Sequence, residues 1–573
     1  MKYTGARIVI ECLAEQGVTT VFGYPGGTIL NIYDELYKHK DRIRHILTAH
    51  EQGASHAADG YSRSTGKTGV VFATSGPGAT NLVTGIATAY MDSVPLVAIT
   101  CNVATNWLGK DTFQEIDITG VTAPITKHNY IVRDPAQLAD TIRESFAVAQ
   151  SRRPGPVLID IPKNITATLV DYEPARAVFT GNKQNAGNEP GSTERIARIT
   201  ACPWPDEADI AKTAALINAA QRPFIYAGGG VVIGDACIEL LAFAERANIP
   251  VAVSLMGKTA FPAAHPLCTG MIGMHGTVAA NTAVNHADVV LALGARFSDR
   301  VATEPSQFAP EAKIFHVDVD AAEINKNVAS RGFLIGNIKD ILSRLLPLVK
   351  IRARSEWNAQ VDEWKHIVPP IYTQKLPFHP KFMFELIHGL LGDNTIIVTD
   401  VGQHQMWTAQ FYPFATPRTL LTSGGLGTMG YGMGAAIGAQ AANPARHVVL
   451  ITGDGCFRMN CNELATLSHY GFPIIIIVVN NGTLGMVRQW QNLFYEKRYS
   501  ETTLDFGPDF VKLAEAYGIR AFRAATEAEF AEAFRSALSE RTPCLIDCKI
   551  SIDEMVLPMV PAGKPFSAMM LEI

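Results

Sequence analysis

A glycine-flanked aspartate, followed after one helix-sized block and one apolar run by two asparagines, most constrains how this chain can fold. The aspartate lies in the Gly-Asp-Gly triplet 453–455, and the asparagines are residues 480–481. The apolar run 472–479 is typical of a strand buried on both faces of a parallel sheet. Asp454 and Asn481 are then expected at the carboxyl ends of neighbouring strands, where open α/β sheets bind ligands. Carboxylate and amide oxygens are hard ligands, so the pattern predicts a Mg²⁺ site completed by diphosphate oxygens.

Composition indicates a large, well-buried globular enzyme. The chain has 573 residues, of which 47% are hydrophobic and 18% charged, and this length suggests three domains of ordinary size. The net charge of −5 comes without a basic cluster, which argues against nucleic acid as a partner. No apolar run reaches the length of a membrane span, and the first residues resemble an amphipathic helix more than a signal or transit peptide. The nine cysteines lack metal-ligand spacing, which favours reduced, mostly buried thiols and a cytoplasmic protein.

Two polar passages, 181–206 and 351–375, have linker composition and divide the chain. We therefore predict an amino-terminal domain over residues 1–180, a central domain over 207–350 and a carboxyl-terminal domain over 376–573. Apolar runs of strand length alternate with helical patterns in each, so each is predicted to be a doubly wound parallel α/β sheet. The clearest predicted strands are 69–74, 96–100 and 156–161, then 223–228, 289–294 and 314–318, and finally 396–400, 448–452 and the run ending at Asn480.

The Gly-Asp-Gly triplet and the asparagine pair together resemble the thiamine-diphosphate-binding motif of thiamine enzymes. A triplet of this kind alone is more often an ordinary turn. The resemblance implies that Asp454, Asn481 and the backbone carbonyl of Thr483 hold the metal ion. It also implies a second half-site, distant in sequence, with a carboxylate that hydrogen-bonds the aminopyrimidine ring and promotes loss of the thiazolium proton.

Glu51 is the candidate for that carboxylate. A glutamate at a helix start is usually only a favourable charge near the positive end of the helix dipole. Here, however, the whole stretch from Gly23 through Glu51 to Asn81 resembles the pyrimidine-binding domain of the same family. Glu51 is therefore expected to exchange a proton with the cofactor. The same resemblance adds Gly27 and Thr74 to this half-site.

The predicted central strands end in glycines or are followed by acids. Glycine lets a cofactor approach the backbone, and an acid beyond a strand can hold a ribose; singly, such glycines are usually turns. Together these glycines and acids resemble the flavin-binding domain of biosynthetic acetolactate synthases, also called acetohydroxyacid synthases. The resemblance implies FAD. It departs from the family at Asn337, where an aspartate is usual, so one flavin contact is expected to differ. The implied flavin-binding residues are Arg153, Gly228, Gly229, Gly230, Met274, His275, Gly294, Ala295, Arg296, Arg300, Asp318, Glu323 and Ile324.

The stretch that follows Asn481, residues 482–496, resembles the catalytic subunit of the same synthases. Met486 and Trp490 are four residues apart and share a helix face; taken alone, they would more often be core residues. The resemblance puts Trp490 beside the acceptor 2-ketoacid, where it favours 2-ketobutyrate. Arg300 would pair with the acceptor carboxylate, a surface salt bridge being its alternative role. Further implied active-site residues are Phe113, Gln114, Lys163 and Met429, the last bending the cofactor; implied diphosphate contacts are Gly402, Gln403, His404, Gln405, Gly427, Gly453 and Gly455.

The resemblance extends from Gly5 to about Pro561 and implies an acetolactate synthase activity. Such an enzyme decarboxylates pyruvate on thiamine diphosphate and joins the two-carbon unit to pyruvate or 2-ketobutyrate. The products, 2-acetolactate and 2-aceto-2-hydroxybutyrate, belong to the first common step of branched-chain amino-acid synthesis. The resemblance also implies a homodimer or homotetramer and a possible regulatory small subunit.

Three alternatives remain open. A catabolic, flavin-free acetolactate synthase shares the chemistry but lacks the pattern at residues 489–491 and the flavin-type domain. Another thiamine carboligase, or a decarboxylase such as one acting on oxalyl-CoA, would use the same scaffold, although Glu51 argues against a glyoxylate carboligase. A non-catalytic flavoprotein would have no use for Glu51 or Asp454.

Overall fold

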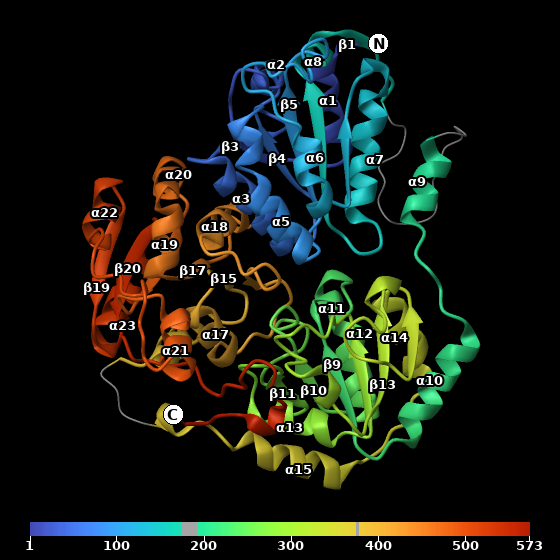
Figure 1. Ribbon diagram of the computed structural model, residues 1–573, viewed down its shortest axis with the longest axis vertical. Helices are drawn as coiled ribbons and strands as arrows, with labels where there is room; N and C mark the ends of the chain where they lie inside the picture. Colours follow the sequence, from blue (N-terminus) through green and yellow to red (C-terminus); the bar gives the residue numbers. More distant parts are fainter. Residues whose placement is uncertain (175–191, 374–377, 573) are drawn as a thin grey trace.

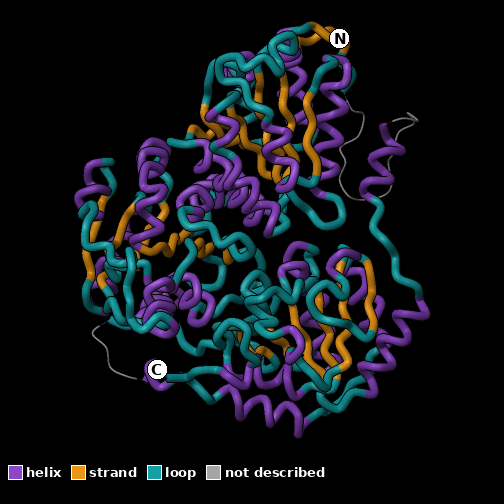
Figure 2. The backbone as a smooth tube through the Cα atoms, in the orientation of Figure 1, coloured by secondary structure: helices purple, strands orange, loops and turns teal. Residues whose placement is uncertain are grey.

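The computed structural model describes residues 1–174, 192–373 and 378–572, and it contains three six-stranded sheets (Figure 1). Helices cover both faces of each sheet, as Figure 2 shows. The three doubly wound α/β domains predicted from the sequence are therefore present, and every strand named above is found within a residue or two of its predicted bounds. Among the described residues, no helix is both long and apolar enough to cross a membrane.

The amino-terminal sheet is parallel, with strand order β3-β2-β4-β5-β7-β6. A short antiparallel ribbon of β1 (Lys2–Thr4) and β8 (Leu169–Asp171) joins the two ends of the domain. The strands are β2 Thr20–Tyr24, β3 Arg44–Leu47, β4 Gly69–Ala73, β5 Leu96–Asn102, β6 His128–Ile131 and β7 Pro156–Pro162. The helices are α1 Gly5–Glu15, α2 Leu30–Lys38, α3 Glu51–Thr65, α4 Pro77–Thr80, α5 Val83–Met91, α6 Ile118–Thr122, α7 Leu138–Gln150 and α8 Lys163–Ala167.

The central sheet has strand order β11-β10-β9-β12-β13-β14 and is also parallel. Its strands are β9 Pro223–Ala227, β10 Val251–Val253, β11 Cys268–Met271, β12 Val289–Leu293, β13 Lys313–Asp318 and β14 Gly332–Ile335. Its helices are α10 Glu207–Ala219, α11 Gly229–Ile233, α12 Cys237–Ala247, α13 Val278–His286 and α14 Ile338–Leu345. The two passages predicted as linkers contain helices α9 (Ser192–Thr200) and α15 (Ser355–Lys365); residues 181–191 and 374–375 of those passages lie outside the described residues.

The carboxyl-terminal sheet has strand order β16-β15-β17-β18-β20-β19. Its strands are β15 Ile396–Thr399, β16 Leu420–Leu421, β17 Val448–Gly453, β18 Ile474–Asn480, β19 Arg520–Ala524 and β20 Cys544–Lys549. Its helices are α16 Pro380–Leu391, α17 Gln403–Phe411, α18 Tyr431–Ala442, α19 Asp454–Asn460, α20 Leu464–Tyr470, α21 Gly485–Phe494, α22 Phe510–Ala516 and α23 Glu527–Glu540. The connection from β17 to β18, expected to hold one helix-sized block, thus holds two helices, because α19 begins at Asp454 itself.

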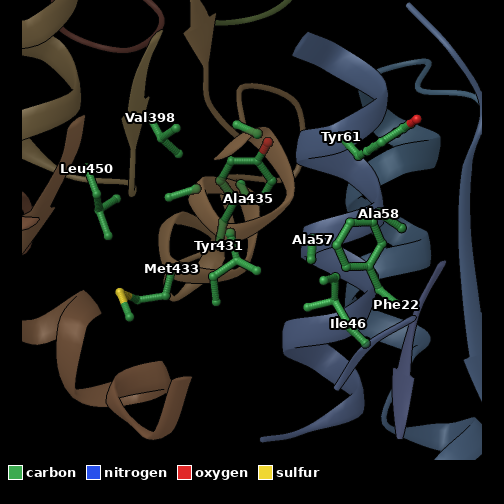
Figure 3. Close-up of a cluster of buried hydrophobic side chains, with 14 of the residues drawn as sticks. Phe22, Ile46, Ala57, Ala58, Tyr61, Val398, Tyr431, Met433, Ala435 and Leu450 are labelled. Carbon is green, nitrogen blue, oxygen red and sulfur yellow. The ribbon is translucent and has the colours of Figure 1, made fainter. Parts of the chain in front are cut away.

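One hydrophobic core joins the amino-terminal and carboxyl-terminal domains. It lies between α3 and α18, and Figure 3 shows Phe22 and Ile46 on one side of it and Val398 and Leu450 on the other. The two helices touch closely because glycines face the opposite backbone. A Cβ atom added to Gly438 would lie 1.8 Å from the carbonyl oxygen of Ala57. The nine cysteines are free thiols, most of them buried, as expected.

Gly438→Ala should destabilise the protein, because the new methyl group meets backbone rather than a flexible side chain. Overpacking of this kind lowers stability by about 1–3 kcal/mol, which should appear as a lower melting temperature. Gly389→Ala is the matched control, since Gly389 lies in α16 with no atom within 4 Å of an added Cβ. There the better helix propensity of alanine should stabilise by about 0.5–1 kcal/mol. Equal melting temperatures for the two variants would contradict the tight α3–α18 contact.

Candidate active site

Each sheet has a topological switch point, where successive connections leave in opposite directions. The switch points lie between β2 and β4, between β9 and β12, and between β15 and β17. Ligands of open α/β sheets bind outside the carboxyl ends of the strands at such points. The residues singled out from the sequence lie at or after the carboxyl ends of strands in all three sheets, with Arg153 before β7 and Trp490 further along α21 as exceptions.

The metal-ligand candidates come together at the carboxyl-terminal switch point. Strands β17 and β18 pair in parallel, so Asp454 and Asn481 follow adjacent strand ends as predicted. Asp454, Asn481 and Thr483 line one small cavity, whose wall comes entirely from residues 401–487. Asn481 Nδ2 donates a hydrogen bond to Gln403 Oε1 at 3.0 Å, and Asn481 Oδ1 accepts one from the Thr483 N–H at 3.2 Å.

Asp454 shows that this cavity suits a cation. Its side chain is buried, and its Oδ2 atom has no hydrogen-bond partner among the described residues. Burial raises the pKa of Asp454 to about 6, because the charged carboxylate is poorly solvated there. In the described part of the chain, no group of three or more His, Cys, Asp or Glu side chains could hold a metal on its own. A Mg²⁺ ion here would therefore take further oxygens from amide or carbonyl groups, water or a bound ligand, and a diphosphate can supply some of them.

The predicted diphosphate contacts surround the same cavity. Gly402, Gln403, His404, Gly453 and Gly455 line it together with Met429. A Cβ atom on Gly402 or on Gly453 would lie 3.0 Å from His404 Cε1, so both glycines leave room for this ring. Burial lowers the pKa of His404 to about 3, which keeps the imidazole neutral.

Two further predicted contacts line a larger cleft beside this cavity. Gln405 Nε2 donates to Thr422 Oγ1 at 2.7 Å, so its side chain holds the loop that precedes Gly427. Gly427 has a φ of 71°, a left-handed conformation that favours glycine.

The amino-terminal half-site is built around Glu51, the first residue of α3. Glu51 is buried, and its Oε2 accepts a hydrogen bond from Asn81 Nδ2 at 2.9 Å. Thr74 follows β4, and its Oγ1 accepts the Thr28 N–H at 3.3 Å. Gly27, in the loop after β2, is exposed. Glu51 therefore sits at the carboxyl edge of its own sheet and not in the wall of the cavity around Asp454.

Three more predicted residues lie on this same edge of the amino-terminal sheet. Phe113 and Gln114 belong to the loop after β5, and Lys163 begins α8 after β7. Phe113 is 87% exposed, which is unusual for so large an apolar side chain. Lys163 is exposed as well, while Gln114, with a φ of 59°, packs against Gly76. Within one chain, the structure does not bring these residues together with Met486 and Trp490.

The glycines of the central domain have a structural role of their own. A Cβ atom on Gly228 would lie 2.1 Å from the carbonyl oxygen of Gly294, and one on Gly230 would lie 2.7 Å from Gly294 Cα. Strands β9 and β12 can therefore stay in contact past their ends only with glycine here. Asn337 accepts the Lys339 N–H at 2.8 Å and caps α14, a role that aspartate could also fill.

A cleft of about 3970 Å³ connects the central switch point with the carboxyl-terminal one. Arg153 reaches it from the amino-terminal domain and pairs with Glu323, Nη1 to Oε1, at 2.7 Å. Burial raises the pKa of Asp318, at the end of β13, to about 6. Ile324 is the one flavin candidate that does not line the cleft; those that do are Arg153, Gly228, Gly229, Gly230, Met274, His275, Gly294, Ala295, Arg296, Arg300, Asp318 and Glu323.

The acceptor-side candidates face this cleft. Met486, Trp490 and Arg300 line it. The Arg300 side chain is 58% exposed and its Nη1 pairs with Asp299 Oδ2 at 2.9 Å, so in the single chain it also has the surface salt bridge considered above.

The wall behind Trp490 is formed by a segment that the sequence analysis did not assign to the site. Trp490 packs on a small buried cluster of Met274, Leu557 and Met559. Residues 554–560 thus return to the pocket after β20, and Val560 N–H donates to the Met274 carbonyl at 2.8 Å. No local pattern marks this return; the burial of the segment is visible only in the fold.

Comparison with known proteins agrees with this geometry. The thiamine pyrophosphate enzyme N-terminal TPP binding domain matches residues 3–121, the central domain 210–345 and the C-terminal TPP binding domain 400–548. A probable acetolactate synthase large subunit of Methanocaldococcus jannaschii is 47% identical, over 98% of this chain and 94% of its own length. The chain belongs to the acetolactate synthase large-subunit family.

Other members of the acetolactate synthase family are similar over comparable lengths. The acetolactate synthase of Arthrospira platensis is 44% identical over 99% of this chain and 98% of its own. The acetolactate synthase large subunit of Corynebacterium glutamicum is 45% identical over 98% of this chain and 89% of its own. The family expected from the sequence motifs is thus confirmed, and the two thiamine-binding matches cover the domains that carry Glu51 and Asp454.

Proposed function

We propose that this chain condenses the two-carbon unit of pyruvate with a second 2-ketoacid, as a thiamine-diphosphate- and Mg²⁺-dependent acetolactate synthase. The observation that carries the proposal is the buried Oδ2 of Asp454, which has no hydrogen-bond partner among the described residues and lies in the cavity that Asn481 also lines. When bound, thiamine diphosphate supplies the electron sink for loss of CO₂ and the carbon that joins the acceptor. The residues of the chain bind and orient the reactants and exclude water.

Asp454, Asn481 and the Thr483 carbonyl would hold Mg²⁺, and the metal would hold the diphosphate. Gly402, Gln403 and His404 would contact that diphosphate; they follow β15 and line the same cavity, which supports this role. Met429, from the loop before α18, extends into the same space and would shape how the cofactor sits. Glu51 would accept and return a proton at the aminopyrimidine ring.

A homodimer would complete the site. Glu51 lies outside the cavity around Asp454, and the exposed Phe113 lies on the same edge as Glu51. In such a dimer, the edge of the amino-terminal sheet that carries Glu51 and Phe113 would cover the Asp454 cavity of the other subunit. This arrangement would explain both the separation of Glu51 from that cavity and the exposure of Phe113. A C2 dimer makes two identical sites in this way.

The cleft of the central domain would hold FAD. The glycines at the switch point line this cleft, and Glu323 Oε2 is buried without a partner among the described residues. Both features suit a ligand with a ribose and a diphosphate.

A possible regulatory small subunit would be tested by affinity purification from the native source, with valine added to the synthase assay.

Acetolactate production from pyruvate tests the proposed activity. We expect product only when thiamine diphosphate and Mg²⁺ are both present, and added FAD should raise the yield of an apoenzyme. Product that forms equally well without flavin would favour the catabolic alternative. Release of CO₂ without acetolactate would favour a decarboxylase, and no turnover of pyruvate would overturn the proposal.

Trp490→Leu should change which acceptor is preferred. The flat ring, which lines the cleft, would pack against the extra methyl group of 2-ketobutyrate, and one such contact is worth about 1–3 kcal/mol. The preference for 2-ketobutyrate over pyruvate should therefore fall about tenfold or more, while acetolactate formation survives. Competition between the two acceptors measures this ratio. A core-packing role predicts instead a lower melting temperature and equal losses with both acceptors.

A further inference from the structure

A chain of buried amide groups connects the proposed metal ligand with the carboxyl-terminal segment 554–560. Asn481 Nδ2 donates to Gln403 Oε1 at 3.0 Å, and Gln403 Nε2 donates to Gln489 Oε1 at 3.1 Å. Gln489 Oε1 also accepts the Val556 N–H at 2.9 Å, and Gln489 Nε2 donates to the Val556 carbonyl at 3.1 Å. Gln403 and Gln489 are only 4% and 2% exposed, so their polar atoms must be satisfied inside the protein.

The direction of this chain of amides is set by the backbone groups of Val556 and Glu554. The N–H and C=O groups of Val556 fix which end of the Gln489 amide is oxygen and which is nitrogen. Gln403 must then present Nε2 to Gln489, and the same nitrogen donates to the Glu554 carbonyl at 2.7 Å. Its Oε1 is left to accept from Asn481 Nδ2. As a result, Asn481 turns its oxygen towards Thr483, in the cavity that also holds Asp454.

The other end of this chain of amides lies behind the proposed acceptor pocket. Leu557 and Met559 are almost fully buried and form, with Met274, the cluster against which Trp490 packs. Gln489 precedes Trp490 on α21, so a single helical turn carries both the amide and the indole.

Gly485 leaves the space in which the side chains of Gln403 and Asn481 meet. A Cβ atom at this position would lie 2.0 Å from Gln403 Oε1 and 2.6 Å from Asn481 Nδ2. A methyl group at position 485 would therefore push Gln403 and Asn481 apart.

We propose that Gln489 is a positioning residue that couples the metal ligand Asn481 to the carboxyl-terminal segment behind Trp490. The inference rests on the proposed function, because it takes Asn481 as a Mg²⁺ ligand and Trp490 as part of the acceptor pocket. Coupling between two sites is reciprocal. Binding of Mg²⁺ and thiamine diphosphate should restrain segment 554–560, and loss of the contact to Val556 should weaken metal binding.

The test compares Gln489→Leu with a matched control, Gln410→Leu. Gln410 Nε2 donates to the carbonyls of Leu557 and His275, at 3.0 and 3.1 Å, and so holds the same segment from a different helix. Two readouts are needed: the affinity for Mg²⁺ at saturating thiamine diphosphate, and hydrogen exchange of the peptide 554–560 with and without both ligands. Gly485→Ala serves as a second variant that interrupts the chain at its metal end.

In the wild-type protein, loading with Mg²⁺ and thiamine diphosphate should slow exchange in residues 554–560. Gln489→Leu should abolish this response and weaken Mg²⁺ binding by up to about 10–100-fold, the effect of losing a direct outer partner of a metal ligand, which here is Gln403. Gly485→Ala should do the same. Gln410→Leu should speed exchange in the segment, yet keep both the response to loading and the wild-type Mg²⁺ affinity.

Three results would overturn the coupling. The first is wild-type Mg²⁺ affinity in folded Gln489→Leu and Gly485→Ala. The second is a Gln410→Leu variant that matches Gln489→Leu in both readouts, which would mean general loosening. The third is a wild-type protein that binds both ligands without any change in exchange, which contradicts the coupling alone. A wild-type protein that binds neither ligand contradicts the proposed function itself.

Discussion

Glu51→Gln is expected to fold and to bind thiamine diphosphate, yet to lose about 10²–10⁴-fold in acetolactate formation, the usual contribution of acid–base catalysis. The amide fills the same space beside Asn81 but cannot exchange a proton with the aminopyrimidine ring. Deuterium exchange at the reactive thiazolium carbon of the bound cofactor measures the affected step directly.

Glu385→Gln is the matched control for this substitution. Glu385 is an exposed residue of α16 that pairs with Lys381, and its replacement should leave both exchange and turnover unchanged. If Glu51→Gln exchanged deuterium at the wild-type rate, Glu51 would not be the acid that activates the cofactor.

Asp454→Ala should abolish retention of thiamine diphosphate rather than turnover alone. The diphosphate would be held through the metal, and a direct ligand should matter more than an outer partner, so we expect the cofactor to bind more than about 100-fold more weakly. Equilibrium dialysis at several Mg²⁺ concentrations measures this loss. Because the pKa of Asp454 is about 6 without metal, cofactor retention by the wild type should also weaken below that pH, as protons compete with Mg²⁺.

Asp393→Ala provides the control on the same domain, since Asp393 is an exposed carboxylate that contacts His388. It should retain the cofactor normally. Unchanged thiamine affinity and Mg²⁺ dependence in Asp454→Ala would show that the Gly-Asp-Gly triplet is an ordinary turn.

The sequence was sufficient to predict the sheets and the closeness of Asp454 and Asn481. Apolar runs such as 474–480 are long and uninterrupted, so their strands were identifiable without tertiary information. The sequence indicated that Asp454 and Asn481 lie close together, because neighbouring parallel strands end at the same edge of a sheet. The resemblance to a known family then implied roles for residues that no spacing could assign, and these roles stay predictions.

The remaining features depend on contacts between segments distant in the chain. The return of residues 554–560 to Trp490 and the pairing of Gln489 with Val556 leave no periodic pattern. The glycines at 228 and 294 were interpreted as room for a cofactor, whereas the strand ends already require them for their own packing. The helix that starts at Asp454 was missed, because the flanking glycines suggested a loop.

A mixed dimer tests most directly whether the two half-sites face each other across subunits. Glu51→Gln and Asp454→Ala chains would be co-expressed with different tags, and the mixed species purified through both. One of its two sites would then be intact and the other doubly altered, so about half of the wild-type activity should return, although each variant alone is nearly inactive. If the mixed dimer is no more active than its parents, Glu51 and Asp454 do not serve one site across the subunit boundary.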